Sequence, residues 1–231
     1  MATIAKPNAY RLWSSSVGKK ITMAVSGLIL YGFVLVHMVG NLKVYQGREA
    51  FNHYAEGLRT LGAPFFGHGQ LLWIARIVLL VALLIHIAAV FQLTRQSKAA
   101  RKVSYKKFDG LEFSYASRTM LWGGLLLLAY IVYHLLHLTL GTVHPNFVPG
   151  DAYNNFVVGF QQVPASIAYI VAMIPLALHM YHGFWSMLQT LGANNPKYNK
   201  LRRPIALTLA LAVAVLNIMF PVSVLLGILK L

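Results

Sequence analysis

The sequence predicts an all-α integral membrane protein, a bundle of five transmembrane helices in one domain over residues 1–231. Of its residues 58% are hydrophobic and only 11% are charged, a composition typical of membrane proteins. Five apolar stretches reach the roughly 20 residues that a helix needs to cross a bilayer. In lipid they must be helices, because their backbone groups have no water to bond. We place the spans at about 21–42, 71–95, 118–141, 164–191 and 204–229.

The orientation of these spans is predicted by where lysine and arginine lie. The arm before the first span and the connections at 95–118 and 192–204 are rich in both residues, whereas the connection at 142–163 has neither. Positively charged connections stay in the cytoplasm. We therefore expect a cytoplasmic N-terminus and a C-terminus outside.

The two outer connections carry signals of their own. The segment 43–70 is long, aromatic and polar, and we expect a short surface helix at about 48–60 within it. The segment 142–163 has turn residues at Pro145, Pro149 and Gly150.

Charge and cysteine content exclude several function classes. The chain has 20 Lys and Arg against 5 Asp and Glu, but nearly uncharged spans do not fit a nucleic-acid binder. There is no cysteine, so this chain has no thiolate-held iron–sulfur cluster, covalent haem or disulfide. A metal in this chain needs His, Met or oxygen ligands.

Six of the nine histidines lie within predicted spans, and titratable residues at membrane depth usually face a functional interior. A helix rises ~1.5 Å per residue, which gives each histidine a depth. His37 and His134 lie ~25 Å and ~24 Å from the inner face. His86 and His182 lie ~13 Å and ~15 Å from it. These depths predict two levels, an outer one and an inner one.

Two histidines that face each other across a bundle have the geometry of bis-imidazole haem ligation. Spacing alone does not decide which histidines form the pairs, because two further histidines lie close to these levels. His137 and His179 lie ~28 Å and ~20 Å from the inner face. His137 is thus an alternative to His134, and depth also permits a pair of His134 with His179.

The chain resembles the membrane cytochrome b subunit of succinate dehydrogenase or fumarate reductase, in its single-chain, diheme, five-helix form. The resemblance covers nearly the whole chain. It rests on the stretches SSSVGKKITMAVSGLIL, FVLVHMVGNL, GREAFNHYAEGLR, IARIVLLVALLIHIAAVFQL, SRTMLWGGLLLLAYIVYHLLHLTLG and HGFWSMLQTLGANNPKYN. Residues 1–231 would then be one cytochrome b domain.

The resemblance implies a ligand set of two haems b. His37 and His134 would hold a distal, outer haem, and His86 and His182 a proximal, inner one. His137 and His179 would then support these ligands.

The resemblance also implies partners and a location. A flavoprotein and an iron–sulfur subunit would bind on the cytoplasmic side of a prokaryotic inner membrane. Succinate chemistry would belong to the flavoprotein, and this chain would exchange electrons with a quinone, expected to be menaquinone. The whole complex is a candidate oligomer.

Several polar residues near the predicted levels are candidates for the haem propionates. Lys19 and Arg118 border the inner level; the alternative is that they are ordinary positive-inside anchors. Arg76 lies on the outer side, where it has no topological role and can meet a propionate or snorkel to the surface. Asn41 and His53 are weaker candidates on the same side.

A quinone site needs an apolar slot, polar groups for the carbonyls and a titratable neighbour. Glu56 is the outer candidate, because some diheme relatives use a Glu near this place; a solvated helix face is the alternative. Trp13 and Ser16 are inner candidates beside the expected iron–sulfur partner. Certain relatives carry a Glu at the position of Met180, so a proton path through that Glu is not supported here.

Three other classes compete with this interpretation. A hydrogenase or formate dehydrogenase cytochrome b also holds haem through histidines, but its catalytic partners lie on the other side of the membrane. A membrane metal hydrolase or a proton-relay transporter normally needs carboxylates in its spans, whereas all five carboxylates here lie in loops.

Overall fold

The protein is an all-helical bundle with five helices long and apolar enough to cross a membrane, as the sequence predicts. The computed structural model describes residues 15–100, 115–193 and 195–231, together with the backbone but not the side chains of 115–118. It has no β-strand in these ranges. The helices, in chain order, are α2 (Ser16–Asn41), α3 (Arg48–Thr60), α4 (Gln70–Ala99), α5 (Tyr115–His134), α6 (Ala152–Gln161), α7 (Val163–Thr190) and α8 (Pro196–Leu225).

The spans begin and end a few residues away from their predicted limits, for local reasons. Ser15 caps α2, because its side chain accepts a hydrogen bond from the backbone N–H of Gly18 at 2.9 Å. α8 begins well before residue 204, because Asn195 caps it and Pro196 occupies its first turn. Charged and polar residues that hydropathy excludes therefore extend two of the spans.

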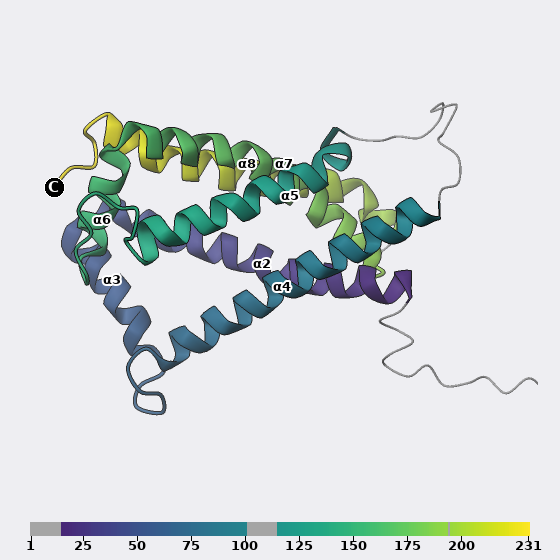
Figure 1. Cartoon of the computed structure of the whole chain (residues 1–231), viewed down its shortest axis with the longest axis horizontal. Helices are drawn as coiled ribbons and strands as arrows, with labels where there is room; N and C mark the ends of the chain where they lie inside the picture. Colours follow the sequence, from purple (N-terminus) through teal and green to yellow (C-terminus); the bar gives the residue numbers. More distant parts are fainter. Residues whose placement is uncertain (1–14, 101–114, 194) are drawn as a thin grey trace, which may run out of the picture.

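One end of the bundle is covered by α3, α6 and the C-terminus; we call it the capped end (Figure 1). The surface helix predicted at 48–60 is confirmed as α3. α6 lies where only turns were predicted, and Asp151 begins it by accepting a hydrogen bond from the N–H of Asn154. Asp151 also binds Arg48 and Asn52 of α3, so one carboxylate ties the two surface helices together.

The end of α5 departs from regular α-helical geometry. Residues Leu135–Thr139 form a π-helical turn, in which the N–H of Leu140 bonds the carbonyl of Leu135 at 2.8 Å. Such turns are frequently found at functional sites. Gly141 follows with a φ of 74°, and a side chain there would collide with Phe147.

The transmembrane helices pack in two groups. α4 packs on α2, while α5 and α8 both pack on α7. α2 also contacts α7 and so joins the two groups. α2 and α5 are not among the extensively packed pairs, and neither are α4 and α7.

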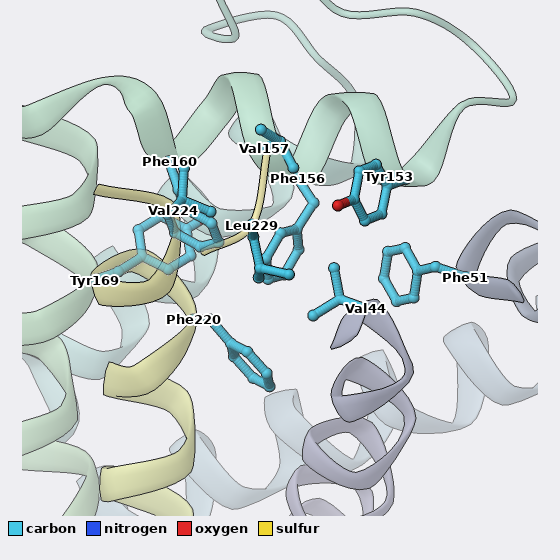
Figure 2. Close-up of a cluster of buried hydrophobic side chains, with 10 residues drawn as sticks. All are labelled: Val44, Phe51, Tyr153, Phe156, Val157, Phe160, Tyr169, Phe220, Val224 and Leu229. Carbon is cyan, nitrogen blue, oxygen red and sulfur yellow. The ribbon is translucent and has the colours of Figure 1, made fainter. Parts of the chain in front are cut away.

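The largest buried apolar cluster lies at the capped end (Figure 2). Phe156 and Phe160 of α6 pack edge-to-face, with ring centres 4.9 Å apart. Tyr169 of α7 lies 4.8 Å from the Phe160 ring, and Phe220 of α8 lies 5.6 Å from Phe156. The cap is thus held by aromatic packing between surface helices and spans.

Candidate functional site

The outer pair of histidines, His37 and His134, meets across the bundle. His37 lies on α2 and His134 on the last turn of α5, and their ring centres are 5.9 Å apart. Asn41, one turn after His37, places its Nδ2 3.3 Å from the Nε2 of His37. The Nδ1 of His134 lies 3.2 Å from the hydroxyl of Tyr169. Both predicted outer ligands are therefore together, with a polar partner for each.

The inner pair joins His86 of α4 to His179 of α7, with ring centres 6.2 Å apart. The Nδ1 of His86 lies 3.1 Å from the carbonyl oxygen of Met23 and 3.3 Å from Ser26 Oγ. A proton on Nδ1 fits this carbonyl, and it leaves Nε2 with a free lone pair that can bind a metal. A Cβ at Gly27 would lie 3.2 Å from the His86 ring, so glycine suits the close approach of this ring to α2.

His182, the inner partner that the resemblance implies, lies nearly one helical turn beyond His179. Its ring centre is 5.1 Å from that of Trp185. The structure thus places His179, which was expected to support the ligands, against His86. The choice of His182 as a ligand stays a prediction.

Three of the four buried polar atoms that lack a partner in the described part of the chain lie on α7, at His179 of the inner pair and within two turns beyond it. Among the described residues these atoms are Tyr31 Oη, His179 Nδ1, His182 Nδ1 and Trp185 Nε1. Buried polar groups are rarely left without a hydrogen bond, so these four atoms could be satisfied by a polar ligand or by ordered water. All lie on α2 or α7, the helices that join the two packing groups.

Both pairs suit a bis-imidazole haem. A metal between two imidazoles separates the ring centres by about 6 Å, because each metal–nitrogen bond is about 2 Å long and each nitrogen lies about 1 Å from its ring centre. Each pair also joins two helices that are not extensively packed against each other. The part of the chain that the structure describes has no cluster of three or more metal-ligating side chains, so the donors occur as pairs.

A tyrosine that the sequence analysis did not single out organises the outer pair. The Tyr169 hydroxyl lies 3.2 Å from His134 Nδ1 and 3.1 Å from His137 Nδ1. Tyr130 packs against both Tyr169 and His134, with ring centres 5.2 Å and 6.0 Å apart. In the sequence Tyr169 is one of twelve tyrosines and lies in an apolar stretch, and only its contacts distinguish it.

Of the residues predicted to bind haem propionates, Arg76 lines a pocket and Lys19 is buried in α2. Arg76 stacks on Trp73 at 4.9 Å and lines a pocket of 170 Å³ together with Arg59, which sequence reasoning missed. Two guanidinium groups on one pocket at the capped end suit a carboxylate or phosphate. Lys19 is buried in the first turn of α2. The Arg118 side chain lies outside the described residues.

Two further outer candidates are exposed at the capped end. Glu56 pairs with His68 at 2.9 Å and with Arg59 at 3.1 Å. The hydrogen bond with His68, aided by Arg59, lowers the pKa of Glu56 below its usual value. Its carboxylate therefore stays charged near neutral pH. His53, also on α3, is exposed.

The inner quinone candidates are not brought to a pocket. Ser16 is exposed at the start of α2, and Trp13 lies outside the described residues.

Comparisons with protein-family models, with curated proteins and with solved structures find no match for this chain. A function for this chain therefore has to be inferred from the two histidine pairs and their hydrogen-bond partners.

Proposed function

We propose that this chain is the membrane anchor and diheme cytochrome b subunit of a succinate:quinone oxidoreductase. In this role it carries electrons between an iron–sulfur partner and a membrane quinone. The observation that supports it most is the presence of two histidine pairs, each bridging helices from different packing groups with the ring separation of bis-imidazole ligation.

The ligands we assign follow the ring contacts. His37 and His134 would hold the outer haem, and His86 and His179 the inner one, with His182 as the alternative inner ligand that the resemblance favours. A haem with two imidazole ligands supplies one-electron transfer and has no open position for oxygen. The protein's own part is to orient each imidazole through a second hydrogen bond, which Met23 does for His86 and Tyr169 for His134.

The arrangement of the pairs suits transport across the membrane. The outer pair lies beside the capped end, because His134 ends α5 next to the loop that leads to α6. The inner pair lies deeper in the bundle, near the middle of α4 and α7. Together the pairs mark two positions along one path through the apolar bundle.

The partners and location follow from the predicted orientation. The basic connections at 95–118 and 192–204 would face the cytoplasm of a prokaryotic cell and border the iron–sulfur and flavoprotein subunits. Succinate would be oxidised on the flavoprotein, and menaquinone is the expected quinone. The five candidate spans support a multi-pass membrane protein.

A dithionite-reduced minus oxidised spectrum with haem quantitation tests this proposal. We expect two haems b per chain in the purified complex, and succinate-dependent reduction of both when the soluble partners are present. One haem would show that one pair is wrongly assigned. A folded preparation without haem would refute the cytochrome proposal.

A further inference from the structure

The α3–α4 loop, residues 61–69 at the capped end, displays apolar side chains on its outside. Phe65 is 92% exposed, and Leu61 and Phe66 are exposed beside it. An aromatic ring in this position is unfavourable in water, because apolar surface prefers an apolar environment. Neighbouring exposed apolar side chains of this kind commonly mark a surface that meets a protein or a membrane.

The backbone of the loop holds these side chains in place. The Gly69 N–H donates to the Arg59 carbonyl at 2.6 Å and ties the two ends of the loop together, while the Phe66 N–H donates to the Gly62 carbonyl at 3.0 Å. Gly62 has a φ of 87°, and a Cβ there would lie 2.8 Å from the Phe66 ring, so the turn requires glycine. Phe65 is therefore displayed on a closed, hydrogen-bonded turn.

The loop lies beside the bundle, within reach of lipid. In Figure 1, α3 slopes away from the bundle, and the loop at its end projects sideways, clear of α6 and of the C-terminus. Along the long axis of the molecule, the loop is nearer to the middle of the spans than α6 is (Figure 1). Because the spans run along this axis, lipid at the capped end can surround the loop while α6 remains outside the membrane.

The apolar surface of the loop continues onto α4. Trp73, in the first turn of α4, is 61% exposed, and a Cβ at Gly69 would lie 3.9 Å from its ring. Ile74 and Ile77 follow on α4 and are also exposed. α4 is one of the five candidate spans, so these residues face lipid. Tryptophan at the end of a span is typical of the headgroup level of the bilayer.

The charges around this surface suit phospholipid rather than a protein partner. Arg76 stacks on the α4 indole at 4.9 Å. Arg59 and His68 flank the loop and pair with Glu56 at 3.1 Å and 2.9 Å. From residue 57 to residue 108 the sequence has five arginines and lysines before position 102 and no carboxylate. Aromatic rings beside cations, without an acidic neighbour in the loop, match the phosphates and acyl chains of a lipid surface.

We propose that residues 61–69 are an interfacial membrane anchor. Phe65 and Leu61 insert among the acyl chains of the leaflet at the capped end, and the Trp73 indole lies at the level of the phosphates. The bilayer surface is thus the partner of this loop, and the anchor fixes the depth of α3 relative to the membrane. The inference goes beyond the proposed function, since it requires neither haem nor quinone.

The absence of cysteine makes a direct test possible, because each single-cysteine variant gives this chain one reactive thiol. Opened native membranes are treated with a water-soluble polyethylene-glycol maleimide, and the gel shift of the chain is followed relative to the same variant in SDS. Phe65→Cys should react about tenfold more slowly than His53→Cys, an exposed position on α3, because apolar surroundings exclude the reagent and disfavour the thiolate. Leu61→Cys retains Phe65 and should be protected equally. A rate equal to that of His53→Cys at either loop position would overturn the inference.

A second measurement identifies the neighbour of the loop, because a covering protein would also slow the labelling. Photolysis of native membranes in which benzoylphenylalanine replaces Phe65 should add the mass of a phospholipid to the peptide that contains the loop. The same replacement at His53 is the matched control and should give no lipid adduct. A crosslink from position 65 to a protein, whether a second copy of this chain or another subunit, would overturn the inference.

Discussion

The two histidine pairs have similar ring separations but very different surroundings. The outer pair is embedded in an aromatic, hydrogen-bonded cluster, in which Tyr169 reaches both His134 and His137. The inner pair has one well-anchored member, His86, and one member, His179, whose Nδ1 has no partner among the described residues. Hydrogen bonds within the protein thus orient both members of the outer pair but only one member of the inner pair.

The difference shows that two observations have to be kept apart: the distance between the two rings of a pair, and the hydrogen bonds that each ring makes with the rest of the protein. Separation indicates which residues can share a metal. Second contacts fix the tautomer and orientation of each ring before the metal arrives. On this basis Tyr169 orients His134 without a metal, whereas His179 would depend on a bound haem for its orientation, if the proposed function holds.

The largest expected effect comes from removing one ligand of each pair. His37→Ala and His86→Ala should each lower the haem content from two to one per chain, because a single imidazole cannot complete the bis-histidine site. Reduced-minus-oxidised spectra with haem quantitation check this. His53→Ala, an exposed histidine on α3, is the control and should keep both haems. Retention of two haems by either ligand variant would remove that pair from the assignment.

The next prediction decides which residue pairs with His86: His179, whose ring meets it in the structure, or His182, which the family resemblance implies. His179→Ala should remove the inner haem, because His179 is the ring that meets His86. His182→Ala should keep it, because its ring packs on Trp185. The same spectra, recorded on both variants, decide between them. The reverse result would restore His182 as the ligand.

A smaller effect tests the preorganisation of the outer pair. Tyr169→Phe removes the hydroxyl shared by His134 and His137 and leaves two buried ring nitrogens unpaired, at a cost of about 1–3 kcal/mol. It should lower the midpoint of thermal unfolding and shift the potential of the outer haem while leaving the inner one unchanged. Tyr130→Phe is the matched control, since the Tyr130 hydroxyl makes no hydrogen bond with a described residue. Equal shifts at both haems would contradict a local role for Tyr169.

The smallest effect concerns the clamp between α3 and α6. Burial raises the pKa of Asp151, but hydrogen bonds from Asn52, the Asn154 N–H and Arg48 outweigh it and hold the pKa below its usual value. The clamp is therefore fully present above the usual pKa and is lost as pH falls through the lower folded value. Asp151→Ala should destabilise the protein by about 1 kcal/mol at pH 7, since it removes a helix cap.

Thermal unfolding at pH 7 and at pH 3 measures this effect. The difference between the wild type and Asp151→Ala should shrink at the lower pH, where the carboxyl begins to be protonated. A difference that grows on acidification would contradict this role for Asp151.

Hydropathy was sufficient to predict the five spans, because a bilayer requires long apolar helices regardless of how they pack. It was not sufficient for α6, where Phe156 and Phe160 are buried by partners from distant parts of the chain. The turn residues beside α6 were visible, but the packing that stabilises it was not. The predicted orientation of the chain stays a prediction, since the structure contains no membrane.

The candidate site likewise has residues that the sequence could single out and residues that it could not. Depth and charge singled out the histidines at both levels, because a titratable ring in a span is conspicuous in the sequence. The choice between His179 and His182 could not be made from depth, since they lie on the same face of one helix within a single turn. Tyr169 and Arg59 carried no signal, because their roles depend on contacts across the bundle.

The π-helical turn at Leu135–Thr139 has a consequence for changes in chain length. An α-helix rotates about 100° per residue, so removing one residue here would restore α-helical geometry and turn His137 away from Tyr169. His134 precedes the turn and would keep its place against His37. A one-residue deletion within Leu135–Thr139 would therefore change the position of His137 without changing that of His134. A deletion earlier in α5 would instead shift both histidines together. Homologues that differ in length here should differ in the position of His137 while retaining the outer pair.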